Sequence, residues 1–214
     1  MTILLTGGSG QLGTELQRLG DYVAPSHQEM DITDPRTVKE CLQKLLPRLI
    51  VHAAAYTNTL GADLDTDEMV TCWRTNVLGT RTLAHLATCP IIYISSEAVI
   101  HPYSIYVLSK LKGEFEIATS HYGYRIIRTS FRPDPFPYPK AFDDMWTLAD
   151  STPVIAQLIQ DLVNSGKTLN DIIYVGTGAK TMYELAKRSR PDVQPCPRLD
   201  AHSFLPSLEE LRSI

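Results

Sequence analysis

The sequence predicts an α/β protein with a doubly wound parallel sheet, on two observations. Short apolar runs alternate along the chain with segments whose apolar residues recur at helical spacing. Such alternation is typical of strand–helix–strand units, whose right-handed crossovers place helices on the faces of a parallel sheet. In addition, a glycine-rich segment directly follows the first apolar run and opens the first helical pattern. The 214 residues, 43% of them hydrophobic, suffice for one domain, or one domain with a small appendage.

The predicted strands are short, continuous apolar runs, typical of strands buried on both faces of a parallel sheet. They cover residues 3–5, 22–24, 49–52, 91–94, 124–127 and 172–175. Segments with apolar residues three and four apart predict helices over residues 11–19, 34–45, 65–88, 104–119, 153–163 and 182–188, with a last helix near Ser207. Asp34 and Pro35 are typical of a helix start, and Gly20 is typical of a helix end.

The segment TGGSGQLG, residues 6–13, predicts that the first strand–helix turn holds the pyrophosphate of a dinucleotide. Gly7 permits the tight turn, Gly10 leaves room for the phosphates, and Gly13 lets the helix pack closely on the sheet. The helix that starts at Gln11 offers free N–H groups and the positive end of its dipole. A turn with a purely structural role is the alternative. Because the segment lies between a strand and a helix, the sequence favours a Rossmann-type dinucleotide-binding fold.

The residues after the second predicted strand bear on the choice between NAD and NADP. An acidic residue at this place hydrogen-bonds the adenosine ribose of NAD. The chain has Pro25, Ser26 and His27 there, so no carboxylate repels the 2′-phosphate of NADP. Both cofactors stay open, and NADP is at least tolerated. The nearest acid, Asp31, comes slightly later, where it either faces the adenine or is a simple turn residue.

Tyr106 and Lys110 lie four residues apart on a predicted helix, so their side chains share one face. A nearby ammonium favours the phenolate and lowers the pKa of a tyrosine toward the neutral range. Tyr106 can then exchange a proton with a carbonyl oxygen as hydride is transferred to the carbon. Ser96 ends the fourth predicted strand, where such folds bind ligands, and is placed to polarise the same carbonyl. The Tyr–Lys spacing also arises by chance, but the glycine turn upstream favours the catalytic interpretation.

Composition and charge disfavour several classes of function. The formal net charge is −4 and the pI is about 5.8, which argues against nucleic acid or an anionic membrane surface as a partner. No apolar run approaches the ~18 residues of a membrane span, and the chain starts without a basic leader. The four cysteines have no metal-ligand spacing, which favours reduced thiols and predicts no metal site. We therefore expect a cytoplasmic protein.

Composition changes after Arg128, and residues 132–140 contain four prolines. This density excludes a helix or a central strand and predicts an extended connector. The sequence thus divides into a dinucleotide-binding Rossmann domain over residues 1–131 and a short C-terminal, substrate-binding region over residues 132–214, packed on that domain. Lys140, Asp143 and Asp144 in this small, reduced region either face a substrate or are surface charges.

These segments resemble the extended short-chain dehydrogenase/reductase superfamily, and within it the dTDP-4-dehydrorhamnose reductase branch of sugar-nucleotide enzymes. The matching segments run in family order over about residues 1–131 and are TGGSGQLGTEL, MDITDP, HAAAYT, NVLGT, YISSE, YVLSKLKGE and IIRTSF. The resemblance implies a catalytic trio of Ser96, Tyr106 and Lys110, with Asn76 supporting the lysine through water. It also implies cofactor-binding roles for Gly7, Gly10, Gln11, Leu12, Gly13, Asp31, Ile32, Ala53, Ala54, Tyr56 and Lys110.

The function that the resemblance implies is an NAD(P)-dependent reductase, or an epimerase, acting on a nucleotide-linked 4-keto-6-deoxy sugar. A homodimer through long helices is also implied. The chain departs from the family in two places: only nine residues separate Ser96 from Tyr106, where the family has a longer loop, and the region after Phe131 is short. These departures keep open a non-catalytic NAD(P)-binding regulatory subunit, resembling the methionine adenosyltransferase β subunit. A different small carbonyl substrate is the third interpretation.

Overall fold

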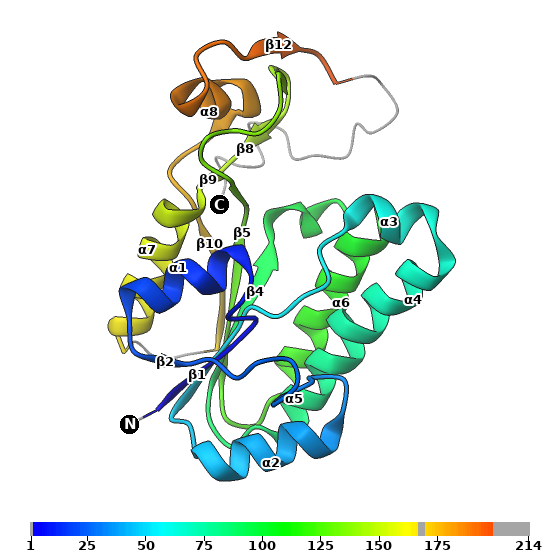
Figure 1. The fold of residues 1–214 in the computed structure, drawn as a ribbon, viewed down its shortest axis with the longest axis vertical. Helices are drawn as coiled ribbons and strands as arrows, with labels where there is room; N and C mark the ends of the chain where they lie inside the picture. Colours follow the sequence, from blue (N-terminus) through cyan, green and yellow to red (C-terminus); the bar gives the residue numbers. More distant parts are fainter. Residues whose placement is uncertain (1, 167–169, 199–214) are drawn as a thin grey trace.

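The computed structural model describes residues 2–166 and 170–198 and contains a central sheet of six parallel strands (Figure 1). The strands follow the order β10-β5-β4-β3-β1-β2, so the chain starts inside the sheet and winds toward both edges. This order, with helices on both faces, confirms the predicted doubly wound α/β fold. The strands are β1 (Ile3–Thr6), β2 (Tyr22–Val23), β3 (Leu49–His52), β4 (Ile91–Ser96), β5 (Tyr124–Thr129) and β10 (Asp171–Val175).

Two layers of helices enclose the sheet (Figure 1). Helices α1 (Gln11–Leu19) and α7 (Thr152–Asn164) pack side by side on one face. The other face is covered by α2 (Pro35–Leu45), α5 (Thr80–Leu86) and α6 (Ile105–Ala118). In this arrangement, the carboxyl ends of all six strands meet at one edge, where ligands bind in open α/β sheets. Within the described ranges, no helix has both the length and the apolar character needed to cross a membrane.

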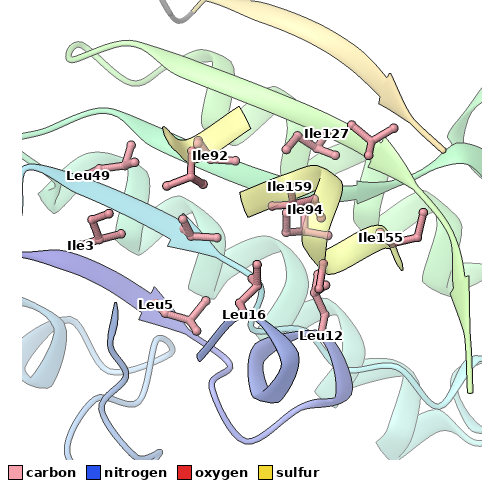
Figure 2. Close-up of a cluster of buried hydrophobic side chains, with 14 residues drawn as sticks. Ile3, Leu5, Leu12, Leu16, Leu49, Ile92, Ile94, Ile127, Ile155 and Ile159 are labelled. Carbon is pink, nitrogen blue, oxygen red and sulfur yellow. The ribbon is translucent and has the colours of Figure 1, made fainter. Parts of the chain in front are cut away.

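Figure 2 shows the apolar cluster between the sheet and the layer of α1 and α7. Leu5 on β1 and Ile127 on β5 belong to this cluster with Leu16 of α1 and Ile155 of α7, and all four side chains are fully buried. Each such side chain stabilises the fold by about 1.5–3 kcal/mol. Because α7 and β10 come late in the chain, the C-terminal part contributes to the core of the main sheet.

A second cluster fills the other face of the sheet. Leu4, Ile50, Ile91 and Ile126 point into it, while their chain neighbours point into the first cluster. Every position of β1 and β3 is therefore buried, as are most positions of β4 and β5. This two-sided burial is the physical reason why the strands are continuous apolar runs in the sequence.

The local signals at helix ends act as predicted. The Asp34 carboxylate accepts the backbone N–H of Arg36 at 2.9 Å, and Pro35 occupies the first helical position of α2. Helix α1 ends at Leu19, and the N–H of Gly20 donates to the carbonyl of Leu16 at 3.1 Å.

The helix predicted over residues 65–88 is interrupted. The structure has α4 (Thr66–Trp73), a π-helical turn over Arg74–Gly79, and then α5, which ends at Leu86. A short helix, α3 (Thr59–Leu64), precedes them and was not predicted. A π-helical turn is a rare deviation that is frequent at functional sites. Here it contains Asn76, whose side chain bonds outside the helix, so tertiary contacts set the local geometry.

Residues 131–151 and 176–198 form a small lobe, seen at the top of Figure 1. Its strands have only two or three residues each, and it has its own apolar cluster around Phe136 and Leu185. The connector predicted over residues 132–140 is confirmed for residues 133–139, which contain neither helix nor strand, whereas its end residues Arg132 and Lys140 belong to short strands. The predicted helices over 153–163 and 182–188 are confirmed, the short strands were not predicted, and the last predicted helix near Ser207 lies outside the described residues. The elements are β6 (Phe131–Arg132), β7 (Lys140–Phe142), β8 (Trp146–Thr147), β9 (Asp150–Ser151), β11 (Lys180–Thr181), α8 (Met182–Ser189) and β12 (Gln194–Cys196).

Candidate active site

A cleft of about 1190 Å³ lies at the carboxyl ends of the strands, between the sheet and the small lobe. Its walls come from the turns after β1, β3, β4 and β5 and from the first turns of α6. Two predicted site residues, Tyr56 and Asn76, lie outside its wall. The others line it together: Gly7, Gly10, Gln11, Leu12, Gly13, Asp31, Ile32, Ala53, Ala54, Ser96, Tyr106 and Lys110.

The glycine turn is shaped by close approaches of the backbone. Gly7 has a φ of +74°, and a Cβ there would lie 2.5 Å from the amide nitrogen of Ala54. A Cβ at Gly13 would lie 2.2 Å from the carbonyl oxygen of Gly7. Only glycine fits at either position. Helix α1 follows Gly10 without a side-chain cap, so the turn offers free N–H groups and a dipole, the features that hold a phosphate.

The residues after β2 form one end of the cleft. The Asp31 carboxylate accepts hydrogen bonds from the backbone N–H and the hydroxyl of Thr33, both 2.8 Å long, and lies 3.7 Å from His27 Nε2. Asp31 is thus a turn residue that also lines the cleft, and its contact with the adenine stays a prediction. Pro25 and His27 line the same end, and no carboxylate stands directly after β2. The tolerance of this wall for a 2′-phosphate stays a prediction.

Helix α6 carries Tyr106 and Lys110 into the cleft wall. Ser104 caps the helix, because its Oγ accepts the backbone N–H of Val107 at 3.2 Å. Lys110 is 3% exposed, and its Nζ lies 4.2 Å from the centre of the Tyr93 ring. Burial lowers the pKa of Lys110 to about 7. The lysine is therefore poised to gain or lose a proton near neutral pH.

The tyrosine behaves differently from the sequence-based expectation. Burial raises the pKa of Tyr106 to about 12, and the Arg132 charge opposes this shift only in part. The prediction that Lys110 lowers the pKa of Tyr106 is therefore wrong. A lysine whose own pKa is near 7 is only partly charged at neutral pH, and desolvation of the phenolate outweighs it. Tyr106 is thus a protonated phenol, the form that donates a proton.

Ser96 lies at the carboxyl end of β4 and lines the cleft beside the α6 residues. Its Oγ accepts the backbone N–H of Ala98 at 3.2 Å and caps the 3-10 helix over Glu97–Ile100. This contact orients the side chain and uses one lone pair, so the O–H group stays available as a donor. The geometry agrees with a serine that polarises a carbonyl oxygen.

Asn76 is buried behind the cleft and connects two of its walls. Its Oδ1 accepts the backbone N–H of Tyr56 at 2.8 Å, and its Nδ2 donates to the Tyr56 carbonyl at 3.1 Å and to Ser109 Oγ at 2.9 Å. Ser109 Oγ in turn donates to the Tyr106 carbonyl at 2.7 Å. Asn76 thus positions the loop after β3 against α6. Its predicted support of Lys110 through water stays a prediction, and the Tyr56 hydroxyl bonds Glu68.

Glu97 and Arg132 are among the cleft residues that were not predicted from the sequence. Glu97 is buried, and its carboxylate accepts hydrogen bonds from the Thr147 hydroxyl and from the backbone N–H of Leu148, the second at 3.0 Å. These bonds connect the small lobe to the end of β4. The place of Glu97 directly after Ser96 is a signal that could have revealed it. Arg132 follows β5 within the proline-rich segment, where nothing local marks it. Lys140, Asp143 and Asp144 do not line the cleft, which favours the surface interpretation.

The fold defines the class of the protein as an α/β protein of the Rossmann type. Solved structures share this fold. The dTDP-4-dehydrorhamnose reductase of Bacillus anthracis in complex with NADP has a TM-score of 0.78 and 23% identity, covering 92% of this chain and 85% of that one. The corresponding reductase of Clostridium acetobutylicum has a TM-score of 0.79 and 22% identity, covering 97% and 86%.

The sequence match defines the family. The chain belongs to the family described as the RmlD substrate binding domain, which matches residues 1–132. A curated relative, the dTDP-4-dehydrorhamnose reductase of Aggregatibacter actinomycetemcomitans, is 32% identical over 152 residues, which are 60% of this chain and 51% of that protein. The chain thus spans about half the length of the curated relatives it matches. The family match confirms the resemblance predicted from the sequence.

Proposed function

We propose that this protein is an NAD(P)-dependent reductase, or an epimerase, acting on a nucleotide-linked 4-keto-6-deoxy sugar. The observation that carries the proposal is a single cleft that holds the glycine turn together with Ser96, Tyr106 and Lys110. Relatives named dTDP-4-dehydrorhamnose reductase support this substrate class. The complete trio also argues against a purely regulatory subunit, which needs no proton donor.

The residues present fit a dinucleotide. A Cβ at Gly7 or Gly13 would close the turn, and α1 keeps N–H groups free of any side-chain cap. Gly7, Gly10 and Gly13 with Gln11 and Leu12 would hold the pyrophosphate, while Asp31 and Ile32 would line the adenosine, and Ala53 and Ala54 the nicotinamide half. Tyr56 lies outside the cleft wall, so it would act only through its backbone bonds to Asn76. The absence of a carboxylate after β2 supports NADP as well as NAD. When bound, the nicotinamide supplies the hydride.

Tyr106 and Ser96 act on the oxygen of the substrate carbonyl. Tyr106, protonated at neutral pH, gives its proton to this oxygen while hydride arrives at the carbon, so the product is an alcohol. Ser96 donates a hydrogen bond to the same oxygen and stabilises the negative charge that develops on it. Lys110, one helical turn from Tyr106 and with a pKa of about 7, restores the proton on the phenol.

Tyr106→Phe tests this mechanism, since it removes one hydroxyl and keeps the ring. We expect a fall of about 10²–10⁴-fold in kcat with dTDP-4-dehydrorhamnose, because the general acid is lost, while calorimetry shows unchanged binding of NADP⁺. Tyr122→Phe, at an exposed tyrosine remote from the cleft, is the matched control. Wild-type turnover in the Tyr106 variant would rule the mechanism out.

We also propose the domain division, with dinucleotide binding in residues 1–131 and substrate binding in residues 132–214. The glycine turn lies in the first part, and Pro137, Tyr138 and Met145 of the second part face it across the cleft. A cytoplasmic location is proposed as well, because all four cysteines are free thiols, as is typical of a reducing compartment.

A homodimer is proposed on the basis of exposed apolar residues. Val70 and Trp73 of α4 and Leu108 and Phe115 of α6 are 41–60% exposed, and the two helices pack against each other. Exposed apolar residues grouped on neighbouring helices mark protein–protein interfaces. Light scattering is expected to give twice the mass of the chain, and a monomer at micromolar concentration would contradict the proposal.

A further inference from the structure

Arg132 is a cleft residue for which the dinucleotide site gives no role. It lies on β6, is half-buried, and lines the cleft near Tyr103 and Tyr106. Its Nη1 donates to Ser130 Oγ at 3.1 Å and to the Phe131 carbonyl at 2.9 Å. Over residues 2–166 and 170–198, no carboxylate pairs with Arg132. A guanidinium carries a permanent charge, so one that lines a cleft without pairing with a described carboxylate calls for an anion.

Glu97, an acid that lines the same cleft, is not available as that anion. Glu97 is buried, and its two oxygens accept hydrogen bonds from Thr147 and from the Leu148 N–H. These bonds direct the Glu97 carboxylate toward the small lobe. The charge of Arg132 acts instead on Tyr103 and Tyr106, whose pKa values it lowers against the effect of burial.

The arginine is held before any ligand arrives. Its backbone pairs with β9, where Arg132 lies opposite Ser151, and its carbonyl accepts the Thr152 hydroxyl at 3.1 Å. At the other end of the side chain, Ser130 and Phe131 hold Nη1. A side chain fixed at both ends loses little conformational entropy when it binds, which favours a specific contact.

Arg132 is well separated from the glycine turn. The turn follows β1 and Arg132 follows β5, with β3 and β4 between them. Three strand spacings amount to ~14 Å, so one phosphate group does not reach both places. The cleft volume of about 1190 Å³ also exceeds the ~300–1,000 Å³ that is usual for one small ligand. The cleft thus has room for a second anionic ligand at the Tyr106 end.

We propose that Arg132 binds the diphosphate of the nucleotide-linked substrate, as a second anion site distinct from the glycine turn. This inference rests on the proposed function and names the residue that recognises the diphosphate of the substrate. The planar guanidinium forms paired hydrogen bonds to phosphate oxygens, and a lysine ammonium does not reproduce this geometry. With the diphosphate held at Arg132, the linked sugar extends toward Ser96 and Tyr106, which line the same end of the cleft.

Calorimetry at saturating NADP⁺ tests the proposal, with dTDP, UDP, GDP and the matching nucleosides as probes. We expect at least one nucleoside diphosphate to bind tighter than its nucleoside. Arg132→Gln is expected to lower the affinity for that nucleoside diphosphate about 10- to 100-fold. The affinities for the nucleoside and for NADP⁺ are expected to stay unchanged. Arg132→Lys keeps the charge and should give an intermediate loss. Arg18→Gln removes an equal charge from an exposed pair with Glu15 and is the matched control.

Three outcomes would overturn the proposal. The first is an Arg132→Gln variant that binds the nucleoside diphosphate as tightly as the wild type, and the second is an equal loss of NADP⁺ affinity in this variant. The third is a wild type that binds NADP⁺ but binds no nucleoside diphosphate tighter than its nucleoside. Circular dichroism of Arg132→Lys and Arg132→Gln checks that both variants fold. A wild type that binds no dinucleotide at all would instead overturn the proposed function.

Discussion

The glycine turn and the small lobe form opposite walls of one cleft, but the first wall is made of backbone and the second mainly of side chains. The turn consists of backbone, from the consecutive residues 6–13, with approaches so close that a single Cβ would not fit. The facing wall depends on side chains that are far apart in the chain, such as Glu97, Arg132 and Thr147. The first wall therefore accepts few substitutions, and the second is where substitutions can change the substrate.

The largest effect is expected from Gly13→Val. Its Cβ would meet the Gly7 carbonyl at 2.2 Å, so the turn must open and the cofactor wall is lost. We expect more than a ~100-fold loss of NADP⁺ affinity, equivalent to about 3 kcal/mol, measured by calorimetry. Gly166→Asn is the control, because a Cβ there would have no neighbour within 4 Å among the described atoms and asparagine tolerates the φ of +59°. Retained affinity in the Gly13 variant would show that the backbone wall is less constrained than its geometry indicates.

Lys110 lies between the two walls and should make stability depend on pH. Its pKa falls from 10.5 to about 7 on folding. Between these values the unfolded chain binds a proton that the folded protein does not, so the free energy of unfolding rises with pH. Lys110→Met should remove this rise, which amounts to at most about 5 kcal/mol.

Thermal unfolding of the cofactor-free protein between about pH 7 and about pH 10 measures this rise. Lys39→Met, at an exposed lysine of α2, is the control and should keep the wild-type slope. Equal slopes for the wild type and the Lys110 variant would mean that the lysine keeps its usual pKa in the folded protein.

A smaller effect is expected from Glu97→Gln, which tests the wall made of side chains. The amide keeps the shape of Glu97 but weakens its bonds to Thr147 and Leu148, at a cost of about 1–3 kcal/mol. We expect a lower Tm and a higher KM for the nucleotide sugar, with NADP⁺ affinity unchanged. Glu40→Gln, exposed on α2, is the control. A fall in NADP⁺ affinity would mean that the small lobe also shapes the cofactor wall.

The sequence predicted best where structure depends on neighbours in the chain. The strands were recognised because burial on both faces makes every residue apolar, and the Asp34 cap was recognised because a helix start is a local event. The π-helical turn was not predicted, because it depends on bonds from Asn76 to Tyr56 and Ser109. The predicted direction of the shift in the pKa of Tyr106 was wrong for a related reason. Sequence spacing reveals a nearby lysine, but it does not reveal how deeply the phenol is buried.

By itself, the sequence determined the doubly wound sheet, the glycine turn and the pairing of Tyr106 with Lys110, since these depend on periodicity and on contacts within a few residues. Only the tertiary structure decided that Glu97 ties the small lobe to β4 and that Arg132 lines the cleft without pairing with a carboxylate of the described ranges. The physical reason is that burial and charge pairing arise between segments that meet only after folding, and a linear pattern does not record which segments meet.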